Sequence, residues 1–304
     1  MTQSPAQSVS AFARQLLAPN PGPMTLDGTQ SYVLAFPGAE GTVVVDPGPD
    51  DAGHLGALAA EGPVELVLVT HRHPDHTEGI DRLHALTGAP VRAVLPEHCR
   101  PAAPGHPLHG TLAGDGDPLR PEEVVAAAGL RIRVLATPGH TSDSVCFLLP
   151  DDGPHGAVLT GDTILGRGTT ILDFPDGTLG DYLGSLELLA GLGAATVLPA
   201  HGPVLPDLAA IAAAYRMHRL ERLRQVRDAV VQLDLQLDPP LDPPPDAQRI
   251  APEDGGSPAA PDVRRVADVV YADVDSSVRG AAEHSVAAQL SYLATLDPAG
   301  RAAL

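Results

Sequence analysis

The sequence lacks lysine and tryptophan altogether and is poor in other aromatic residues, with four Phe and five Tyr among 304 residues. All 19 basic residues are therefore arginines, and 38 acidic residues set the formal net charge at −19. Affinity for a phosphate backbone comes largely from basic side chains, and single-stranded bases stack on aromatic rings. The composition therefore argues against a generic polyanion-binding protein, while leaving room for a local basic track.

Cysteines and long apolar runs are also scarce. Cys99 and Cys146 are too few for a disulfide framework, and each is expected to be a free, buried thiol. No stretch approaches about 18 uninterrupted apolar residues, so no transmembrane helix is expected. The first twenty residues carry Arg14 as their one charge and contain no long apolar run, which argues against a signal peptide. We therefore expect a cytoplasmic protein that does not enter a membrane.

Short apolar runs interleaved with helical patterns predict an α/β layered architecture. A chain of 304 residues can hold one large domain and a small one. The expected strands are 32–36, 42–46, 64–69, 91–95, 130–136, 144–149, 157–160 and 195–198. The expected helices are 12–17, 51–60, 77–86, 179–192, 207–235, 263–271 and 278–296, with Asp50 as a possible cap of the second.

The composition changes in the last third of the chain and suggests a division into parts. We assign residues 1–206 to a catalytic domain and 207–235 to a long connecting helix that belongs to a C-terminal module. Residues 236–262 hold eight prolines and no apolar periodicity, so they are expected to form an extended linker or exposed loop. Residues 263–304 would complete the small helical module.

One loop is dense in side chains that bind metals. It follows the predicted strand 64–69 and places His71, His73, Asp75 and His76 within six residues. A polar, solvated turn is the alternative, but packing alone does not require this composition. The loop is therefore a candidate metal site, and it needs further ligands elsewhere in the chain to be convincing.

Three such residues, His140, Asp162 and His201, each follow another apolar run. All seven side chains would then lie at the C-terminal ends of predicted strands, where α/β folds usually bind ligands. Imidazole and carboxylate ligands suit Zn²⁺, with Mn²⁺ or Fe as possibilities. Seven ligands exceed the needs of one tetrahedral ion, so we expect two Zn²⁺ ions that share a carboxylate.

Other polar residues have weaker claims. Asp46, at the end of the strand 42–46, would either hydrogen-bond a ligand imidazole or cap its strand. The remaining histidines lack a comparable context and are interpreted as surface or hydrogen-bonded loop residues; examples are His54, His84, His106 and His109.

The pattern His-x-His-x-Asp-His at 71–76, with the later ligand types in order, resembles the signature of the metallo-β-lactamase superfamily over about residues 24–207. This resemblance implies a four-layer αββα fold. It also implies one zinc held by His71, His73 and His140. A second would be held by Asp75, His76 and His201, and Asp162 would bridge the two.

Several further segments are similar to the β-lactamase-like protein 2 family; they are Asn20–Pro23, Thr25–Thr29, Thr137–Thr141, Gly161–Gly166, Gly168–Thr170, Pro199–Pro203 and Tyr215–Arg219. That family resemblance implies a winged-helix-like C-terminal module over residues 263–304. It also implies endonucleolytic cleavage of single-stranded RNA.

The predicted metal pair indicates hydrolysis. Water bound to zinc becomes acidic enough to supply hydroxide at neutral pH, and this hydroxide can attack a phosphodiester or an acyl carbon. Asp75 is the candidate to orient the nucleophile or return a proton to the leaving group. It could also serve simply as a metal ligand, and the two roles are compatible.

The substrate is less well defined by the sequence. On the predicted helix 207–235, Arg216, Arg219 and Arg227 fall within an arc of about 80°, which suits an RNA backbone. The alternative is a solvated helix face laced with acidic residues. Thr169 is a further candidate to line a substrate pocket, although it could equally serve a turn.

A second hypothesis is a thioester hydrolase, either glyoxalase II-like or an acyl-thioesterase. The same metal core serves both reactions, and a small anionic thioester could use the same arginines. The third hypothesis, a non-catalytic scaffold or binding protein, is disfavoured by the intact ligand set. Whether the protein forms oligomers is left open.

Overall fold

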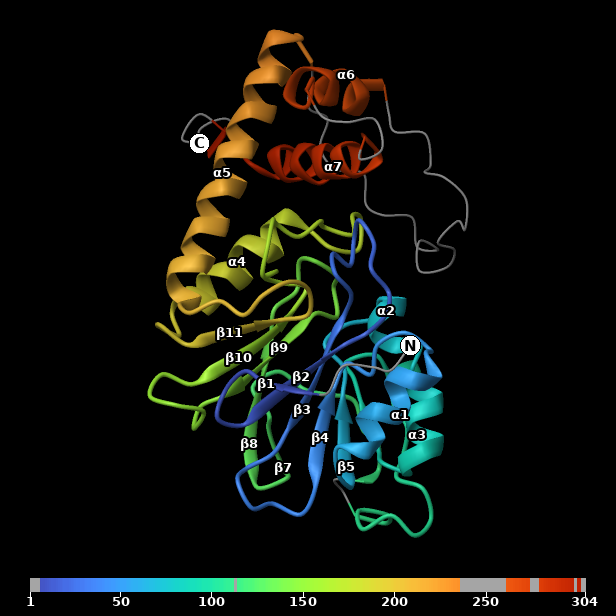
Figure 1. The fold of residues 1–304 in the computed structure, drawn as a ribbon. Helices are drawn as coiled ribbons and strands as arrows, with labels where there is room; N and C mark the ends of the chain where they lie inside the picture. The colour runs from blue at the N-terminus through green and yellow to red at the C-terminus, as the bar shows by residue number, and fades with distance from the viewer. Residues whose placement is uncertain (1–5, 112–113, 236–260, 274–278, 298–299, 302–304) are drawn as a thin grey trace.

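Two β-sheets stack face to face in the computed structural model, and helices cover both outer faces (Figure 1). The structure describes residues 6–111, 114–235, 261–273, 279–297 and 300–301. This arrangement confirms the predicted four-layer α/β fold. Within the described residues, no helix is both long enough and apolar enough to cross a bilayer.

The first sheet has the strand order β1-β2-β3-β4-β5-β6. Its strands are β1 (Gln7–Ser8), β2 (Ala13–Leu17), β3 (Gln30–Leu34), β4 (Thr42–Val45), β5 (Val64–Leu68) and β6 (Val91–Arg92). The pairs β4–β5 and β5–β6 are parallel, and the others are antiparallel. Parallel strands end at the same edge, so the residues that follow β4 and β5 emerge together.

The second sheet has the order β11-β10-β9-β8-β7. Its strands are β7 (Val124–Ala127), β8 (Leu130–Ala136), β9 (Val145–Leu149), β10 (Ala157–Gly161) and β11 (Thr196–Pro199). The pair β10–β11 is parallel, with Leu159 opposite Leu198. The loops after these two strands therefore leave the same edge of the sheet.

The core between the sheets consists of aliphatic and aromatic side chains that point inward from both. Leu34, Leu68, Phe147 and Leu159 are each at most 1% exposed. The outer face of the first sheet is covered by α1 (Ala52–Ala60) and α3 (Ile80–Thr87), and a separate apolar cluster fills that layer. A short helix, α2 (Pro74–Thr77), and a 3₁₀ turn, η1 (Pro96–His98), complete this half.

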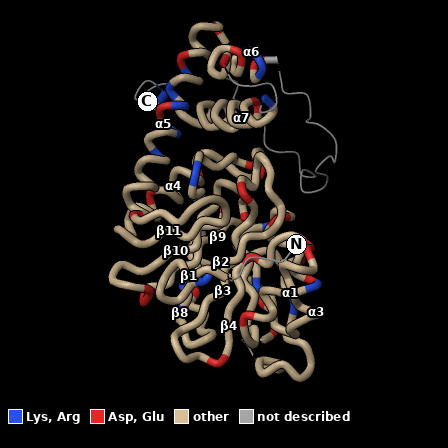
Figure 2. Tube along the Cα trace, in the orientation of Figure 1, with Lys and Arg blue, Asp and Glu red and all other residues tan. Residues whose placement is uncertain are grey.

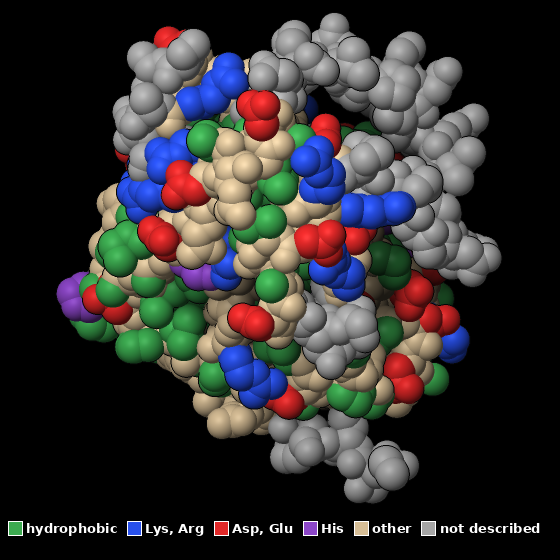
Figure 3. All heavy atoms as spheres, turned by 90° about the horizontal axis from the view of Figure 1, so that it is seen from above, with side chains coloured by type: hydrophobic (Ala, Val, Ile, Leu, Met, Phe, Trp, Pro, Cys, Tyr) green, Lys and Arg blue, Asp and Glu red, His purple; other side chains and the backbone are tan. Residues whose placement is uncertain are grey.

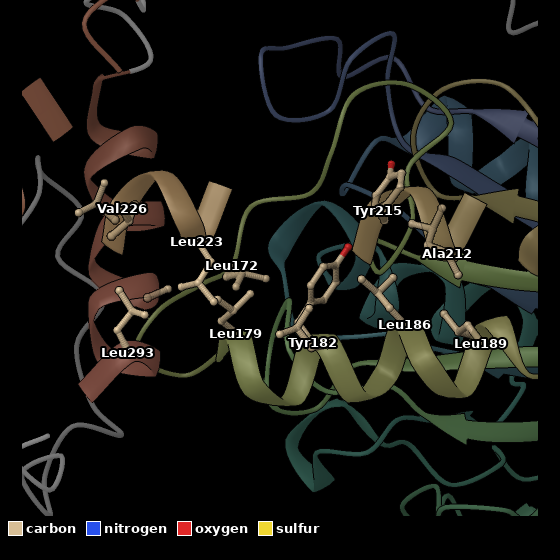
Figure 4. Packing of buried hydrophobic residues seen from close by; sticks show 14 of the residues in the cluster. Leu172, Leu179, Tyr182, Leu186, Leu189, Ala212, Tyr215, Leu223, Val226 and Leu293 are labelled. Atoms are coloured by element: carbon tan, nitrogen blue, oxygen red, sulfur yellow. The ribbon is translucent and has the colours of Figure 1, made fainter. Parts of the chain in front are cut away.

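The outer face of the second sheet is covered by α4 (Leu179–Ala190) and the first half of α5 (Leu208–Gln232). The second half of α5 extends beyond the sheets and packs against α6 (Pro261–Val270) and α7 (Arg279–Thr295) (Figure 1). One continuous apolar cluster joins these helices, with Leu223 and Val226 of α5 near Leu293 of α7 (Figure 4). The long helix is thus shared between both parts of the molecule.

The proposed domain boundaries stay predictions. Most of the expected linker, residues 236–260, lies outside the described residues. In the described residues from 261 onward, the only regular secondary structure is helical, so the expected helices are present there. A winged-helix assignment for this module also stays a prediction.

Some local expectations were wrong. Residues 13–17 of the helix expected at 12–17 form strand β2, because pairing with β3 along its whole length outweighs the helix propensity of Ala, Arg, Gln and Leu. The cap of α1 is Asp51, whose side chain accepts from His54 N at 2.8 Å, and not Asp50. The helix expected at 77–86 begins at Ile80 as α3, and Thr77 instead ends the short helix α2. Strands β1 and β7 were not expected.

Candidate metal centre

The seven ligand-type side chains of the sequence converge at the edge where the strands end. They form two groups, one of His71, His73, His140 and Asp162 and the other of Asp75, His76 and His201. Within each group the potential ligand atoms lie within 4.8 Å of one another. The Nδ1 atom of His73 is 3.0 Å from Nε2 of both His71 and His140. Three imidazole rings therefore face one point.

Two of the rings are held from behind by a network around Asp46. His76 Nδ1 donates to Asp46 Oδ2 at 2.9 Å. Thr70 donates to both oxygens of Asp46 through its amide and its hydroxyl, and Thr70 Oγ1 is 3.1 Å from His71 Nδ1. Since that hydroxyl proton is directed at Asp46, the Nδ1 proton of His71 is donated to Thr70. When both rings are neutral, their Nε2 atoms are left with lone pairs that face the centre.

The other three rings follow the same rule. His140 Nδ1 donates to the carbonyl of Ile171 at 2.6 Å, and His201 Nδ1 donates to the carbonyl of Gly28 at 3.2 Å. The outer Nε2 of His73 lies 3.3 Å from Asp173. Each outer nitrogen thus has an acceptor, so in the neutral ring each inner nitrogen presents a lone pair.

Both carboxylates lie among these nitrogens. Asp162 Oδ1 is 3.2 Å from His201 Nε2, and its Oδ2 is 3.6 Å from His140 Nε2. Asp162 therefore faces both groups. Asp75 Oδ2 lies 3.3 Å from Nε2 of both His76 and His201 and accepts a hydrogen bond from Thr29 Oγ1 at 2.9 Å.

This arrangement fits a divalent cation. His76 Nε2 and Asp162 Oδ1 are buried, and neither has a hydrogen-bond partner in the described part of the chain. Leaving buried polar atoms unpaired costs about 1–3 kcal/mol each, so such atoms are rare without a reason. A cation between converging lone pairs and carboxylates would satisfy both atoms.

The ionisation states also suit a cation. Burial lowers the pKa of His140 to about 4, and burial with neighbouring imidazoles lowers that of His71 well below its usual range. Burial opposes ionisation of Asp162, but the charges of His76 and His201 hold its pKa at about 2. Burial likewise disfavours charged His201, yet Asp162 and Asp75 raise its pKa to about 9. A bound cation would replace the protons that these carboxylates otherwise attract.

Two glycines allow the loops to approach this closely. Gly161 ends β10 with φ +48°, and a Cβ there would lie 2.8 Å from the side chain of Thr70. Gly139 precedes His140 with φ +136°, and its Cβ would lie 2.4 Å from Tyr182 Cα. Both positions need a residue without a side chain.

The helix arginines do not form the exposed track that the sequence suggested. Arg219 is only 7% exposed, donates from Nη2 to the carbonyl of Thr170 and lies 5.1 Å above the ring of Tyr182. Arg219 therefore does not belong to an exposed basic track, because packing of α5 against α4 turns this side chain inward; its role as a substrate candidate stays a prediction. Arg216 is exposed on α5, and Thr169 is exposed in the loop beside Thr170.

Acidic partners account for other arginines of this helix. Arg224 lies 3.2 Å from Glu221, and Arg227 lies 2.7 Å from Asp228. Basic and acidic segments lie close together along α5, α6 and α7 (Figure 2). Seen from that end of the molecule, blue and red side chains are interspersed (Figure 3). The solvated, acid-laced helix face was the better interpretation for these positions.

Sequence reasoning named Asp46, which accepts from His76, but missed the other groups that hold the rings from behind. Asp173 lies beside His73, and the backbone carbonyls of Gly28 and Ile171 hold His201 and His140. Every residue has a backbone carbonyl, so the sequence does not indicate which carbonyl will hold a ring. Of these groups, only the side chain of Asp173 could have been recognised from the sequence. Of the other histidines, His84, His106 and His109 are hydrogen-bonded to backbone carbonyls as expected, whereas His54 is fully buried in α1.

The fold and site identify the class of protein. The metallo-beta-lactamase superfamily profile matches residues 24–201. The chain belongs to this superfamily. Its members are generally hydrolases, which agrees with the cluster of metal-type side chains.

Among curated relatives, an atrochrysone carboxyl ACP thioesterase from Aspergillus chevalieri is 34% identical over 74% of this chain and 67% of its own length. A beta-lactamase-like protein 2 homolog from Caenorhabditis elegans is 31% identical over 73% of this chain and 72% of its own. The matches span 63% to 72% of the first three relatives, so about a third of each lies outside the matched region.

Solved structures agree on the fold. A metallo-beta-lactamase family protein from Thermus thermophilus superposes with a TM-score of 0.64 at 24% identity, covering 93% of each chain. Because the superposition covers nearly the whole chain, the likeness includes the α5–α7 part as well as the sheets.

Proposed function

We propose that this chain is a metal-dependent hydrolase of acyl thioesters that works with two Zn²⁺ ions. The observation that carries the proposal is the set of five imidazoles whose outer nitrogens are held by acceptors and whose inner nitrogens face Asp75 and Asp162. His71, His73 and His140 would hold one ion, and Asp75, His76 and His201 the other. Asp162 faces both groups and would bridge the ions.

Bound zinc supplies Lewis acidity, which polarises a carbonyl and makes a water nucleophile accessible near neutral pH. The rest of the chemistry belongs to the protein. Thr29 holds Asp75 by the hydrogen bond to Oδ2, and the nearby imidazoles keep the pKa of Asp75 below its usual range despite burial. An ionised Asp75 can orient a water molecule and accept its proton.

The leaving group favours a thioester. A thiol has a pKa of about 8.5, so it departs as a thiolate without strong protonation, whereas an alkoxide leaving group benefits from a general acid. All five histidines of the cluster are engaged as ligand candidates, and Asp75 is a weak acid donor at neutral pH. The 34% identical relative named as an ACP thioesterase supports the same substrate class.

Hydrolysis of single-stranded RNA is the second candidate. It is supported by the similarity to a beta-lactamase-like protein 2 homolog and by the exposed Arg216 on α5. The burial of Arg219 and the acidic partners of Arg224 and Arg227 remove most of the basic track on which this candidate depended. A non-catalytic scaffold is the least favoured hypothesis, since it would not need the complete ligand set.

One substrate panel tests the proposal. Metal-depleted and zinc-restored protein would be assayed with acyl thioesters and with single-stranded oligoribonucleotides, alongside metal analysis. We expect close to two ions per chain and zinc-dependent release of free thiol, lost in Asp75→Asn. Cleavage of the oligonucleotides without thiol release would overturn the thioester assignment, and activity in the metal-depleted protein would overturn the metal assignment.

A further inference from the structure

A cavity lies beside the metal centre, between the helices α5–α7 and the loop after β10. Its volume is about 270 Å³, slightly below the range of about 300–1,000 Å³ typical of whole-ligand sites. It therefore has room for part of a ligand. It is lined by Thr169, Thr170, Ile171, His218, Arg219, Arg222, Tyr271, Ala281, Ala282 and Ser285, and we call it the anion pocket.

The anion pocket carries an excess of positive charge. Two arginines and a histidine line it, and none of the ten described lining residues is acidic. Arg222 Nη1 donates to the neutral amide of Gln225 at 2.7 Å, and its guanidinium lies 4.7 Å above the ring of Tyr271. Arg219 donates to a carbonyl, and its buried Nε has no hydrogen-bond partner among the described residues. Among the described residues, no carboxylate is paired with either arginine, in a chain whose net charge is −19.

The pKa of a histidine that lines the pocket reflects the same excess of positive charge. His218 lies on α5 one turn before Arg222, and its pKa is lowered by burial and by the charges of Arg219 and Arg222. An anion in the pocket would relieve this repulsion. Tyr271 Oη and Ser285 Oγ also line the pocket and hydrogen-bond each other at 3.2 Å, which leaves one hydroxyl proton to donate to the same anion.

The pocket shares a wall with the metal centre. Ile171 lines it, and the Ile171 carbonyl holds His140 Nδ1 at 2.6 Å. Thr170 also lines it, with Oγ1 3.2 Å from the same nitrogen. A long substrate bound at the metal centre could therefore pass this loop and place its far end among the arginines.

We propose that the anion pocket binds the phosphate at the far end of a pantetheine-type thiol, so that the substrates are thioesters of a phosphorylated carrier arm. This inference rests on the proposed thioesterase function. Arginine pairs are suited to phosphate because their planar forks donate two parallel hydrogen bonds to its oxygens. Arg222 provides the principal charge, since Arg219 is already committed to Thr170.

The test compares S-acetyl pantetheine with S-acetyl 4′-phosphopantetheine, which differ only in the phosphate. We expect kcat/KM to be roughly 10- to 100-fold higher for the phosphorylated substrate, through a lower KM, as charged hydrogen bonds of this kind contribute. In Arg222→Gln this preference should fall to about twofold or less. The matched control Arg224→Gln, on the same helix but paired with Glu221, should keep it.

Equal kcat/KM for the two substrates in the unaltered protein would overturn the proposal, as would the same loss of preference in both variants. Thermal unfolding of each variant would show that it is folded.

A separate measurement distinguishes failure of the pocket from failure of the thioesterase assignment. Calorimetric titration with 4′-phosphopantetheine should show binding by the unaltered protein and by Arg224→Gln, and binding at least tenfold weaker by Arg222→Gln. This result would support the pocket even if no thioester were hydrolysed. Absence of binding would overturn the proposed phosphate site and leave the thioesterase assignment unaffected. Stronger binding by a single-stranded oligonucleotide, increasing with its length, would overturn the proposal and indicate that the pocket binds an RNA backbone.

Discussion

The loops at the strand ends and the helix α5 each carry a cluster of polar residues, yet the two clusters have opposite arrangements. The loop residues point to one centre, with ligand atoms within 4.8 Å in each group. The arginines of α5 point in several directions, one into the core and others toward acidic neighbours. Parallel strands end together, so their loops must meet. Residues on a helix are spread around its axis, and their surroundings depend on whatever packs against each face.

The largest expected effect concerns the convergent cluster. In Asp75→Asn the carboxylate can no longer accept a proton, and kcat should fall by about 10²- to 10⁴-fold. Thiol release from an acyl thioester would measure the loss. The control is Asp50→Asn, which removes an exposed partner of Arg82 outside the cluster and should leave kcat unchanged. Equal rates for Asp75→Asn and the unaltered protein would show that convergence alone does not make a catalytic group.

Metal addition should produce the next largest effect. A ligand that binds only the folded state stabilises it by about 3–4 kcal/mol when its free concentration is 10²- to 10³-fold above Kd. Urea unfolding of the metal-depleted protein, with and without buffered Zn²⁺, would measure this gain. We expect His76→Ala to lose most of it and His54→Gln, outside the cluster, to retain it. An undiminished gain in His76→Ala would place the ion elsewhere.

Two substitutions compare the contributions of a buried and an exposed arginine of α5 to stability. Arg219→Ala removes a hydrogen bond to the Thr170 carbonyl and packing over Tyr182, so we expect a loss of about 2–4 kcal/mol in the free energy of unfolding. Arg224→Ala breaks an exposed ion pair, which is typically worth less than about 1 kcal/mol. Urea unfolding compares them directly. Similar losses in both would contradict the difference in their surroundings.

The smallest effect concerns a histidine outside the cluster. His54 is fully buried next to Ser31, and burial lowers its pKa to about 4. Below its unfolded pKa of about 6.5, the unfolded chain takes up a proton that the folded chain does not, so stability falls as the pH falls toward 4. From pH 7.5 to 5.0 this costs about 2 kcal/mol.

His54→Gln should lose that part of the pH dependence, because glutamine does not titrate. Unfolding midpoints of both proteins at pH 7.5 and 5.0 provide the measurement. If the two proteins lost the same stability on acidification, titration of His54 would not be the cause.

The metal-type residues were accessible from the sequence because each follows a strand, and strand ends fix where a chain emerges. The α/β layering followed from the same runs, whereas the fold with two stacked sheets was implied by the family resemblance. Strand β2 was not accessible, since its helix-forming residues become a strand only by pairing with β3. The inward turn of Arg219 was equally hidden, because it depends on where α4 and Tyr182 lie. What escaped prediction was set by contacts between segments far apart in the chain.

The hydrogen bond from Arg219 to Thr170 has a consequence for recombination between relatives. It ties α5 to the loop whose next carbonyl, that of Ile171, holds His140. The helices α5–α7 therefore cannot be exchanged independently of the sheets. A chimera that takes its helices from one parent and its sheets from another would need a compatible arginine and loop, or His140 would lose the support that keeps its ring aligned.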